Sequence, residues 1–395
     1  MQILEVGTDS HLRNEFLKLP VRIYRNNPYW IRPLDNDIES VFDPKKNKFF
    51  EDGECIRWIA IDSSGQTVGR IAAFYNKHLM HSEDGIPTGS IGFFECANSE
   101  SVASCLFDTG KKWLQFKGLE AMNGPVNFGE RDRFWGLLID GYDKQPTYGM
   151  DYHMPYYRTL FENYGFQTYF EQYTFYMPIT RDEVTARLNP KIYERAQSVF
   201  NTPGYSFRHI KKNELSKFAE DFRIIYNKAW AANSAASQMT PEMAAALIKR
   251  MKPLIVEELM WFGYYEDEPI AFFIMLPEVN QIFQHVNGKL DIIGKLKFLY
   301  HQTMKTNHKV FGIIFGVVPE FQKKGVESAI ALAYTQVAWD IPNFQYTEME
   351  MNWVGSFNKK MISFCRLLGG EIVKTHGTYR YLFDRNSTFT PHPDL

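Results

Sequence analysis

One order of expected elements occurs twice along this chain of 395 residues, and that repetition constrains the fold more than any other feature. Apolar runs at 56–61 and 68–75 flank the turn Asp62-Ser63-Ser64-Gly65, which predicts a β-hairpin. Apolar runs at 259–265 and 270–276 flank a second polar turn in the same way. After each hairpin the pattern predicts a strand, a helix, a strand, a second helix and closing strands. A repeated unit of this size is an independent domain and not a solenoid repeat.

Two domains also agree with the length of the chain, because a single hydrophobic core rarely grows this large. We predict tandem domains at 1–200 and 201–395, in the mixed α/β class. Each domain has a central, mostly antiparallel sheet with helices on its faces. A helix at 181–200 is expected to join them. A helical stretch at 290–305 is expected as an insertion between the second hairpin and its long strand.

Charge and composition argue against several classes of protein. The net charge of −2 provides no basic field, so no nucleic-acid partner is expected. No apolar run approaches the ~18 residues of a membrane span. We therefore expect a cytoplasmic protein, for which contact with a membrane surface stays open. Aromatic residues make up 16% of the chain, which suits a broad core or a large apolar cleft, and the core is the simpler interpretation.

Cysteine and histidine spacing predicts neither a disulfide framework nor a metal site. The cysteines are scattered without a C-x-x-C pair, which is typical of reduced thiols in the cytoplasm. They are Cys55, Cys96, Cys105 and Cys365. His78 and His81 have an i,i+3 spacing, but no third ligand accompanies them, so no metal is expected.

Residues 317–328, with the sequence V-V-P-E-F-Q-K-K-G-V-E-S, carry the strongest local signal for chemistry. A buried strand ends, a short loop turns, and a helix begins. The free N–H groups and the dipole of a helix start attract an anion. Gly325 has no Cβ, so the backbone can approach that anion closely. Lys323 and Lys324 either add positive charge or are only solvated. The pattern predicts a pyrophosphate site.

This stretch resembles the Q/R-x-x-G-x-G/A motif of the GNAT superfamily of N-acyltransferases, whose loop binds the pyrophosphate of acyl-CoA. The match covers Gln322, Gly325 and the strand-to-helix context. It departs at Glu327, which stands where the motif has Gly or Ala. A carboxylate at a helix start suits the dipole, but it repels a phosphate if it faces the ligand.

Two further segments resemble GNAT elements. The sequence E-M-E-M-N at 348–352 resembles the fifth GNAT strand, which separates from the fourth to admit the pantetheine arm. Asn358 and the segment 367–370 resemble the helix whose tyrosine often protonates the leaving thiolate. That tyrosine position falls on Cys365 here, and on Phe161 in the first half. Cys365 is then either an inert buried thiol or a weak acid.

A resemblance to a family of bacterial tandem-GNAT proteins, with a poorly defined substrate, runs nearly from end to end. It rests on the segments 27–30, 43–47, 92–96, 123–127, 136–141, 276–280 and 285–288. That family also has an acidic residue where Glu327 stands. The resemblance implies an N-acyltransferase that uses acyl-CoA or acetyl-CoA as co-substrate. Some related proteins resemble transferases that acylate lipid amines such as sphingoid bases, which implies a small-molecule or lipid amine as acceptor.

The resemblance also implies roles for particular residues. The N–H of Val318 would polarise the thioester carbonyl, and the loop amides would hold the pyrophosphate. The implied acyl-CoA-binding residues are Val318, Gln322, Lys323, Lys324, Gly325, Val326, Glu327, Ser328, Asn352 and Asn358. In the first half, the loop at 97–101 has no such motif, so we expect that half to bind no CoA and to help recognise the acceptor. The segments 124–127 and 130–133 either line the cleft between the domains or form a turn with solvated charges.

The reaction needs a base that takes a proton from the attacking ammonium group, directly or through water. The candidates are Glu348, Glu350, Glu278 and His285. Alternation along a strand puts Glu348 and Glu350 on one face. Their carboxylates either act in catalysis or only face the solvent. With Cys365 as the candidate acid, the amine would attack the thioester in a ternary complex, without a covalent enzyme intermediate.

Two rival interpretations remain. A degenerate GNAT domain that only binds a ligand or partner is favoured by Glu327 and by the missing tyrosine. A transferase that uses aminoacyl-tRNA would want a basic surface, and the near-neutral charge counts against it. The sequence carries no signal for the acyl chain length or the oligomeric state.

Overall fold

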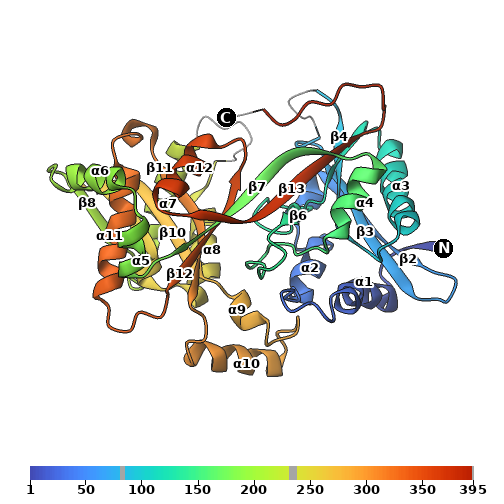
Figure 1. Cartoon of the computed structure of the whole chain (residues 1–395), viewed down its shortest axis with the longest axis horizontal. Coiled ribbons are helices and arrows are strands. Elements are labelled where there is room, and N and C mark those ends of the chain that lie inside the picture. The colour runs from blue at the N-terminus through green and yellow to red at the C-terminus, as the bar shows by residue number, and fades with distance from the viewer. Residues whose placement is uncertain (81–84, 231–237, 394–395) are drawn as a thin grey trace.

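One continuous mixed sheet runs through the whole molecule (Figure 1), in a computed structural model that describes residues 1–80, 85–230 and 238–393. Its strands are, in spatial order, β1 (Gln2–Glu5), β2 (Gly53–Ile61), β3 (Thr67–Asn76), β4 (Thr88–Cys96), β5 (Ala121–Gly124), β13 (Glu371–Leu382), β7 (Gln167–Pro178), β12 (Glu348–Gly355), β11 (Lys309–Val317), β10 (Glu268–Pro277), β9 (Met260–Tyr265) and β8 (Tyr205–His209). A further strand, β6 (Leu137–Asp140), pairs with β13. Neighbouring strands are antiparallel except for β4 with β5 and β11 with β12.

The two halves of the chain exchange strands at the centre of the sheet. Strand β7 belongs to the first half, yet it pairs with β12 on one side and β13 on the other. Phe175 shows this directly, because its partners are Met351 on β12 and Ile372 on β13. Strand β13 belongs to the second half and also pairs with β5 of the first. A boundary at residue 200 therefore separates β7 from both strands with which it pairs.

Helices flank the sheet on both faces, in agreement with the predicted fold class. They are α1 (Ser10–Ile23), α2 (Asp35–Val41), α3 (Glu100–Phe116), α4 (Tyr156–Tyr164), α5 (Arg181–Arg187), α6 (Pro190–Phe200), α7 (Leu215–Ala229), α8 (Pro241–Met251), α9 (Asn280–Phe283), α10 (Ile292–Thr303), α11 (Val326–Asp340) and α12 (Lys359–Leu367). Short 3₁₀ turns occur at η1 (Lys48–Glu51), η2 (Lys252–Leu254), η3 (Glu257–Leu259) and η4 (Pro319–Phe321). Within the described part of the chain, no helix combines the length and apolar character needed to cross a bilayer.

The single helix predicted at 181–200 is wrong, because the structure divides it into α5 and α6. Pro190 explains the break: it lacks an N–H, and it forces the residue before it out of the helical region. Asn189 accordingly has extended backbone and caps α6, accepting a hydrogen bond from the N–H of Lys191 at 3.0 Å. The predicted insertion at 290–305 is confirmed as α10, which stands at the lower edge of the molecule in Figure 1.

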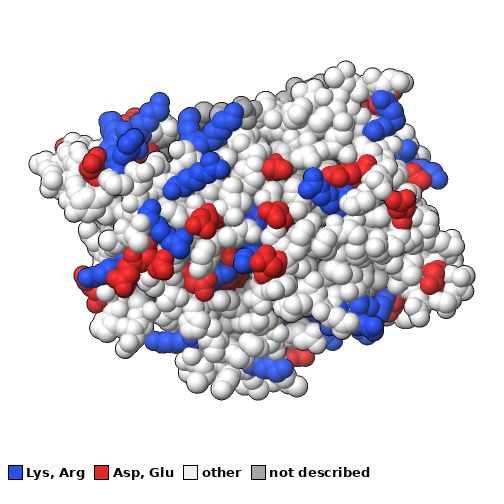
Figure 2. Space-filling view, in the orientation of Figure 1, with Lys and Arg blue, Asp and Glu red and all other residues white. Residues whose placement is uncertain are grey.

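Consecutive residues on β10 identify which helix covers which face, because successive side chains of a strand point to opposite sides. The ring of Phe272 lies 4.8 Å from that of Phe222 on α7. The ring of Phe273 lies 6.4 Å from that of Tyr334 on α11. Helices α7 and α11 therefore cover opposite faces of the second half. Figure 2 shows acidic and basic side chains mixed over the visible surface, without a continuous basic field.

In both halves, the parallel strand pair separates beyond a short stretch of pairing. Strands β11 and β12 pair only from Lys309 with Glu348 to Gly312 with Met351. The register of β10 with β11 shifts at this point, which places a β-bulge at Ile313. Strand β4 carries its own register shift against β3 beyond Gly92. A bulge bends the strand, so the two strands diverge and a split opens between them.

We expect the full chain to unfold in one cooperative transition, because the exchanged strands make the two halves parts of one sheet. Differential scanning calorimetry should give a single peak with equal calorimetric and van't Hoff enthalpies. Two separate transitions, assigned to 1–200 and 201–395 by limited proteolysis during the scan, would contradict this expectation.

Candidate functional site

The split of the first half is closed by the chain itself. Strands β4 and β5 pair only as far as Ser90 with Asn123. Val126 then crosses the gap, and its N–H donates to the carbonyl of Ile91 at 2.9 Å. A Cβ on Gly92 would lie 1.9 Å from the carbonyl oxygen of Val126, so only glycine fits there. The predicted cleft segment 124–127 thus fills the space between these two strands.

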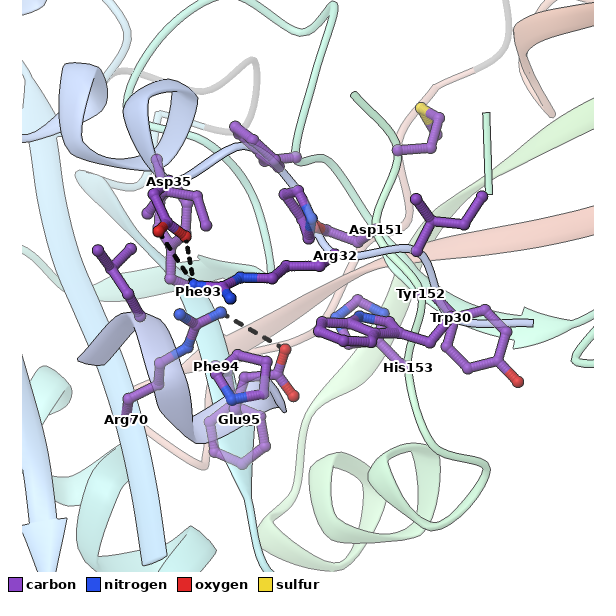
Figure 3. Close-up of a pocket in the computed structure, with 17 residues that line it drawn as sticks. Trp30, Arg32, Asp35, Arg70, Phe93, Phe94, Glu95, Asp151, Tyr152 and His153 are labelled. Atoms are coloured by element: carbon purple, nitrogen blue, oxygen red, sulfur yellow. Dashed lines mark hydrogen bonds and ion pairs between the residues drawn. The ribbon is translucent and has the colours of Figure 1, made fainter. Parts of the chain in front are cut away.

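Next to this closed split lies a small buried pocket of about 30 Å³ (Figure 3). The carboxylate of Glu95 accepts hydrogen bonds from Tyr24 at 2.8 Å and Tyr157 at 2.7 Å. Its other oxygen lies 3.5 Å from the guanidinium of Arg70. Burial raises the pKa of Asp151 to about 8, and the charge of Glu95 adds to that rise. The volume suits roughly one water molecule, so in this conformation the pocket is a polar core and not a substrate site.

In the second half, β11 and β12 are unpaired beyond Gly312 and Met351, which leaves the edge amides of β11 on that side without a β12 partner. The N–H of Val318 donates to the carbonyl of Ile270 at 2.9 Å. Hydrogen-bonded and non-hydrogen-bonded pairs alternate in an antiparallel ladder. The N–H groups of Phe315 and Val317 consequently point away from β10 and toward the split. The proposed role of Val318 is therefore corrected, because its N–H is already bonded within the sheet.

The loop after β11 has the strand-to-helix form that its sequence predicts, but an acidic side chain already lies on it. The carboxylate of Glu327 accepts from the N–H of Lys323 at 3.4 Å. The positive end of the α11 dipole draws it there. The side chain of Gln322 donates to the carbonyl of Val317 at 3.1 Å and ties the loop to the strand. Lys323 and Lys324 are exposed, and Lys323 has a left-handed φ of 63°.

Gly325 is needed for a reason that differs from the predicted one. Its φ is 88°, in the region that favours glycine. A Cβ there would lie 3.0 Å from the carbonyl oxygen of Arg195 on α6. The glycine therefore allows α6 to pack against the start of α11. The side chains of Val326 and Ser328 are also buried, so only their backbone N–H groups can serve an anion.

The two predicted cofactor asparagines have structural partners. The amide of Asn352 donates to the hydroxyl of Thr147, which connects β12 to a first-half loop. Asn358 caps α12, accepting from the N–H of Met361 at 3.1 Å. Asn352 keeps a buried carbonyl oxygen without a hydrogen-bond partner, so its side chain retains one unused acceptor beside the split.

The predicted role of Cys365 as a catalytic acid is wrong. Its side chain is 0% exposed and belongs to the apolar core beneath α12. Burial raises the pKa of the thiol to about 12. A fully covered thiol contacts no substrate, so the simpler interpretation, an inert buried cysteine, holds.

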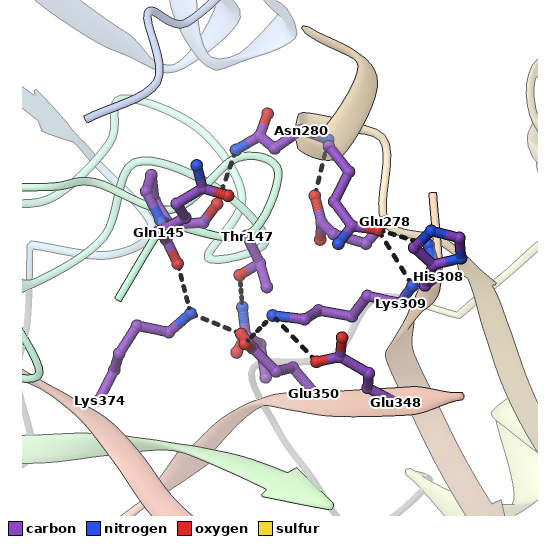
Figure 4. Close-up of polar contacts among 12 residues, drawn as sticks. Gln145, Thr147, Glu278, Asn280, His308, Lys309, Glu348, Glu350 and Lys374 are labelled. Atoms are coloured by element: carbon purple, nitrogen blue, oxygen red, sulfur yellow. Dashed lines mark hydrogen bonds and ion pairs between the residues drawn. The ribbon is translucent and has the colours of Figure 1, made fainter. Parts of the chain in front are cut away.

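A buried ionic cluster joins side chains of β11, β12 and, across β7, β13 (Figure 4). One oxygen of Glu350 contacts the ammonium group of Lys309 at 2.5 Å, and the other contacts that of Lys374. Lys374 also donates to the carbonyl of Gln145 at 2.8 Å. Burial alone would raise the pKa of Glu350, but the two ammonium groups outweigh it and hold that pKa below its ordinary value. Burial lowers the pKa of Lys374 in turn.

Glu278, directly after β10, is only 2% exposed, and burial brings its pKa close to neutral. Its carboxylate accepts from the N–H groups of Asn280 at 2.8 Å and Tyr148 at 3.0 Å. Burial raises the pKa of Glu278 to about 7, and the charge of Glu350 contributes to the rise. A carboxyl that titrates near neutral pH is matched to general base catalysis. The alternation of polar and apolar residues in the sequence could not distinguish Glu278 from the other carboxyl groups, because the burial of Glu278 depends on the first-half loop at 145–148.

The other base candidates are placed less favourably. Glu350 shares a strand face with Glu348, as predicted, but both of its oxygens are occupied by ammonium groups. Glu348 is partly exposed and lies 4.0 Å from Lys309. The ring of His285 stacks on His301 of α10 at 3.9 Å, so it serves the packing of that helix.

The remaining predicted features lie outside the ionic cluster. In the segment 130–133, the carbonyl of Arg131 accepts from the indole of Trp353 at 2.9 Å, and Arg133 lines a small cavity with Tyr148. His78 lies 3.2 Å from Asp52. His81, the other half of the i,i+3 pair, lies outside the described residues.

Replacing Glu350 with Gln should lower the free energy of unfolding by about 3–5 kcal/mol, because two buried ammonium groups lose their shared counter-charge. The matched change Glu348→Gln, on the same strand face but partly exposed, should cost within about 0.5 kcal/mol. Urea denaturation at pH 7 measures both. Equal losses for the two variants would mean that the cluster is not the buried ion pair described here.

Comparisons with known proteins agree with this architecture. No family model matches the chain. It is 25% identical over 380 residues to a protein of Caulobacter vibrioides (strain NA1000 / CB15N) described as bacterial ceramide synthase, covering 96% of this chain and 97% of that one. It is 24% identical over 369 residues to protein YghO of Escherichia coli (strain K12), covering 92% and 91%.

Among solved structures, a tandem GNAT protein from the clavulanic acid biosynthesis pathway matches with a TM-score of 0.56 and 11% identity. The match covers 98% of this chain and 99% of that one. The predicted tandem fold and the resemblance that implied it are thereby confirmed. The chain therefore has the fold of this tandem GNAT protein over its whole length.

Proposed function

We propose that this chain is an acyl-CoA-dependent N-acyltransferase that acylates a lipid amine in its second half. The observation that carries the proposal is the separation of β11 and β12 beyond Gly312, with the ionic cluster on the paired stretch just before it and Glu278 at the Lys309 end of that stretch. The relative described as bacterial ceramide synthase, at 25% identity over nearly the whole chain, supports a lipid amine such as a sphingoid base as acceptor.

Acyl-CoA would bind along β11. The N–H groups of Phe315 and Val317, which the sheet leaves free on the split side, can donate to the thioester carbonyl and to the pantetheine arm. Donors fixed by a strand need no reorganisation when negative charge develops on that oxygen. The backbone N–H groups from Lys323 to Ser328 would hold the pyrophosphate.

Glu278, at the Lys309 end of β11, would take the proton of the attacking ammonium group through bridging water. The neutral amine then attacks the thioester carbon, the C–N bond forms and the C–S bond breaks. The second amine proton, released as the amide forms, neutralises the leaving CoA thiolate. Glu350 acts as a positioning residue in this scheme, because it fixes Lys309 and Lys374 beside the site instead of accepting a proton.

The pH dependence of the reaction should report Glu278. Because burial raises the pKa of Glu278 to about 7, we expect kcat/KM to rise with pH through about 7, as the carboxylate form becomes populated. Glu278→Gln should lower kcat/KM about 10²–10⁴-fold and remove the rise of kcat/KM with pH. Steady-state assays with a long-chain acyl-CoA and sphinganine measure both. An unchanged pH profile in the Gln variant would assign the base elsewhere, with Glu348 as the next candidate.

The loop is expected to bind CoA more tightly without its own carboxylate. Glu327→Ala should strengthen CoA binding about tenfold, because a negative charge 3.4 Å from a loop amide no longer opposes the phosphates. Glu320→Ala, which removes an exposed carboxylate from the same loop, is the matched control and should change affinity less than twofold. Isothermal titration calorimetry with CoA measures the difference. Gly325→Val is unsuitable here, because it disturbs α6 packing.

A second candidate function is favoured by the same carboxylate. Glu327 lies on the loop and weakens it as a phosphate site, as expected for a GNAT domain that binds a ligand without turnover. CoA binding without acyl transfer to any of a panel of lipid amines would support this alternative. Turnover of a long-chain acyl-CoA would reject it.

A further inference from the structure

Helix α10 contacts the rest of the molecule through a narrow stripe. Its packed side is formed by Gly294, Phe298 and His301, which are spaced at i, i+4 and i+7. Gly294 is buried against the backbone of Lys289. The ring of Phe298 lies 5.6 Å from that of Phe283 on α9. Only one of the twelve residues of α10, Gly294, is fully buried. The helix is therefore held along one side and presents its remaining surface to solvent.

That outer surface is apolar to an unusual degree. Among the described residues, fourteen large hydrophobic side chains are exposed, and six of them lie on α10 or the residue after it. They are Ile292 (79% exposed), Ile293 (66%), Leu296 (62%), Leu299 (55%), Tyr300 (61%) and Met304 (58%). At 100° per residue they occupy one arc of roughly 140°, opposite the packed stripe. These six residues are called the α10 apolar face below.

The charges around this face are basic. Four lysines, Lys289, Lys295, Lys297 and Lys305, accompany a single acidic residue, Asp291, in the segment 289–305. Four positive charges less one negative charge give +3, within a chain whose net charge is −2. The one acidic side chain is engaged as the helix cap, accepting from the N–H of Gly294 at 2.9 Å.

Two of these lysines, Lys295 and Lys297, border the α10 apolar face. At about 100° per residue, Lys295 and Lys297 fall on the two opposite borders of the α10 apolar face. Long lysine side chains at such borders can bury their methylene groups and keep the ammonium groups in water. This is the pattern of a helix that lies in the plane of a membrane surface. Figure 2 shows the lower end of the molecule, where α10 stands in Figure 1, as largely white with isolated charged side chains, mostly basic.

We propose that α10 is a membrane-surface helix, which docks the protein on bilayers that contain anionic lipids. The lysine borders favour this occupant over a second copy of the chain. A two-fold pairing of two α10 faces would bring the basic borders of both copies together, with no acidic partner on the helix. An anionic surface supplies the complementary charge. Docking of this kind does not depend on the acyl-transfer reaction.

The place of α10 in the chain connects docking to the site. The helix lies in the segment between Glu278 and Lys309, and both residues belong to the region of the ionic cluster. The backbone N–H of Glu278 donates to the carbonyl of Lys309 at 2.9 Å, which closes the base of this insertion. Docking through α10 would place the region of Glu278 and Lys309 close to the bilayer surface. If the proposed function is right, that is the surface from which a lipid amine would come.

Co-sedimentation of the full chain with vesicles tests the proposal without any substrate. Vesicles of phosphatidylcholine with 30% phosphatidylglycerol, in ~0.1 M salt, should bind the protein at least tenfold more strongly than pure phosphatidylcholine vesicles. The double variant Ile293→Glu, Leu296→Glu should lose at least tenfold in binding to the anionic vesicles. Lys295→Glu with Lys297→Glu should remove the preference for phosphatidylglycerol.

The matched control carries two glutamates at exposed apolar positions outside α10. Phe116 on α3 is 83% exposed and Tyr193 on α6 is 53% exposed. Phe116→Glu with Tyr193→Glu should leave vesicle binding within twofold of the unmodified protein. Circular dichroism spectra and melting temperatures of all variants should match, because every substituted side chain is exposed.

Two results would overturn the proposal. The first is equal binding of the α10 double variant and the unmodified protein to anionic vesicles. The second is the absence of binding to the anionic vesicles by the unmodified protein. A dimer seen by sedimentation equilibrium, which dissociates in the α10 double variant, would then assign the α10 apolar face to a second copy of the chain.

Discussion

The position of β7 between β12 and β13 is the constraint on which the rest of the structure depends. A strand from the first half completes the second half's sheet, and a strand from the second half completes the first's. The ion pair between Glu350 on β12 and Lys374 on β13 crosses over β7, which lies between these two strands. The polar region around the ionic cluster is built on this seam, because Gln145, Thr147 and Tyr148 of the first half reach the second half's polar residues there.

Much of the local structure could be predicted from the sequence. Hairpins, the strand-to-helix loop and the α10 insertion are encoded by turn residues and by periodicity within a short window. The helix predicted at 181–200 is interrupted at Pro190, which disfavours helical backbone at Asn189.

The candidate site could be predicted only in part, because its chemistry depends on pairings between distant residues. Periodicity put Glu348 and Glu350 on one face of a strand. It could not show that Lys374, on the exchanged strand, would neutralise Glu350. The bulge at Ile313 decides that the free N–H groups belong to Phe315 and Val317 and not to Val318. The pKa of Glu278 depends on burial by a loop about 130 residues away.

If the loop binds acyl-CoA as proposed, the carboxylate of Glu327 would act there as a tethered competitor of the phosphates. An anion fixed one helical turn from the site has an effective local concentration in the millimolar range or above, whatever the composition of the solution. Any ligand phosphate must displace it, so a group with one weak negative charge gains little there. A pyrophosphate, with several charges to offer, competes better. Bound in this way, the loop would favour highly charged ligands, and it would recapture its own side chain when such a ligand leaves, which would speed release of the coenzyme.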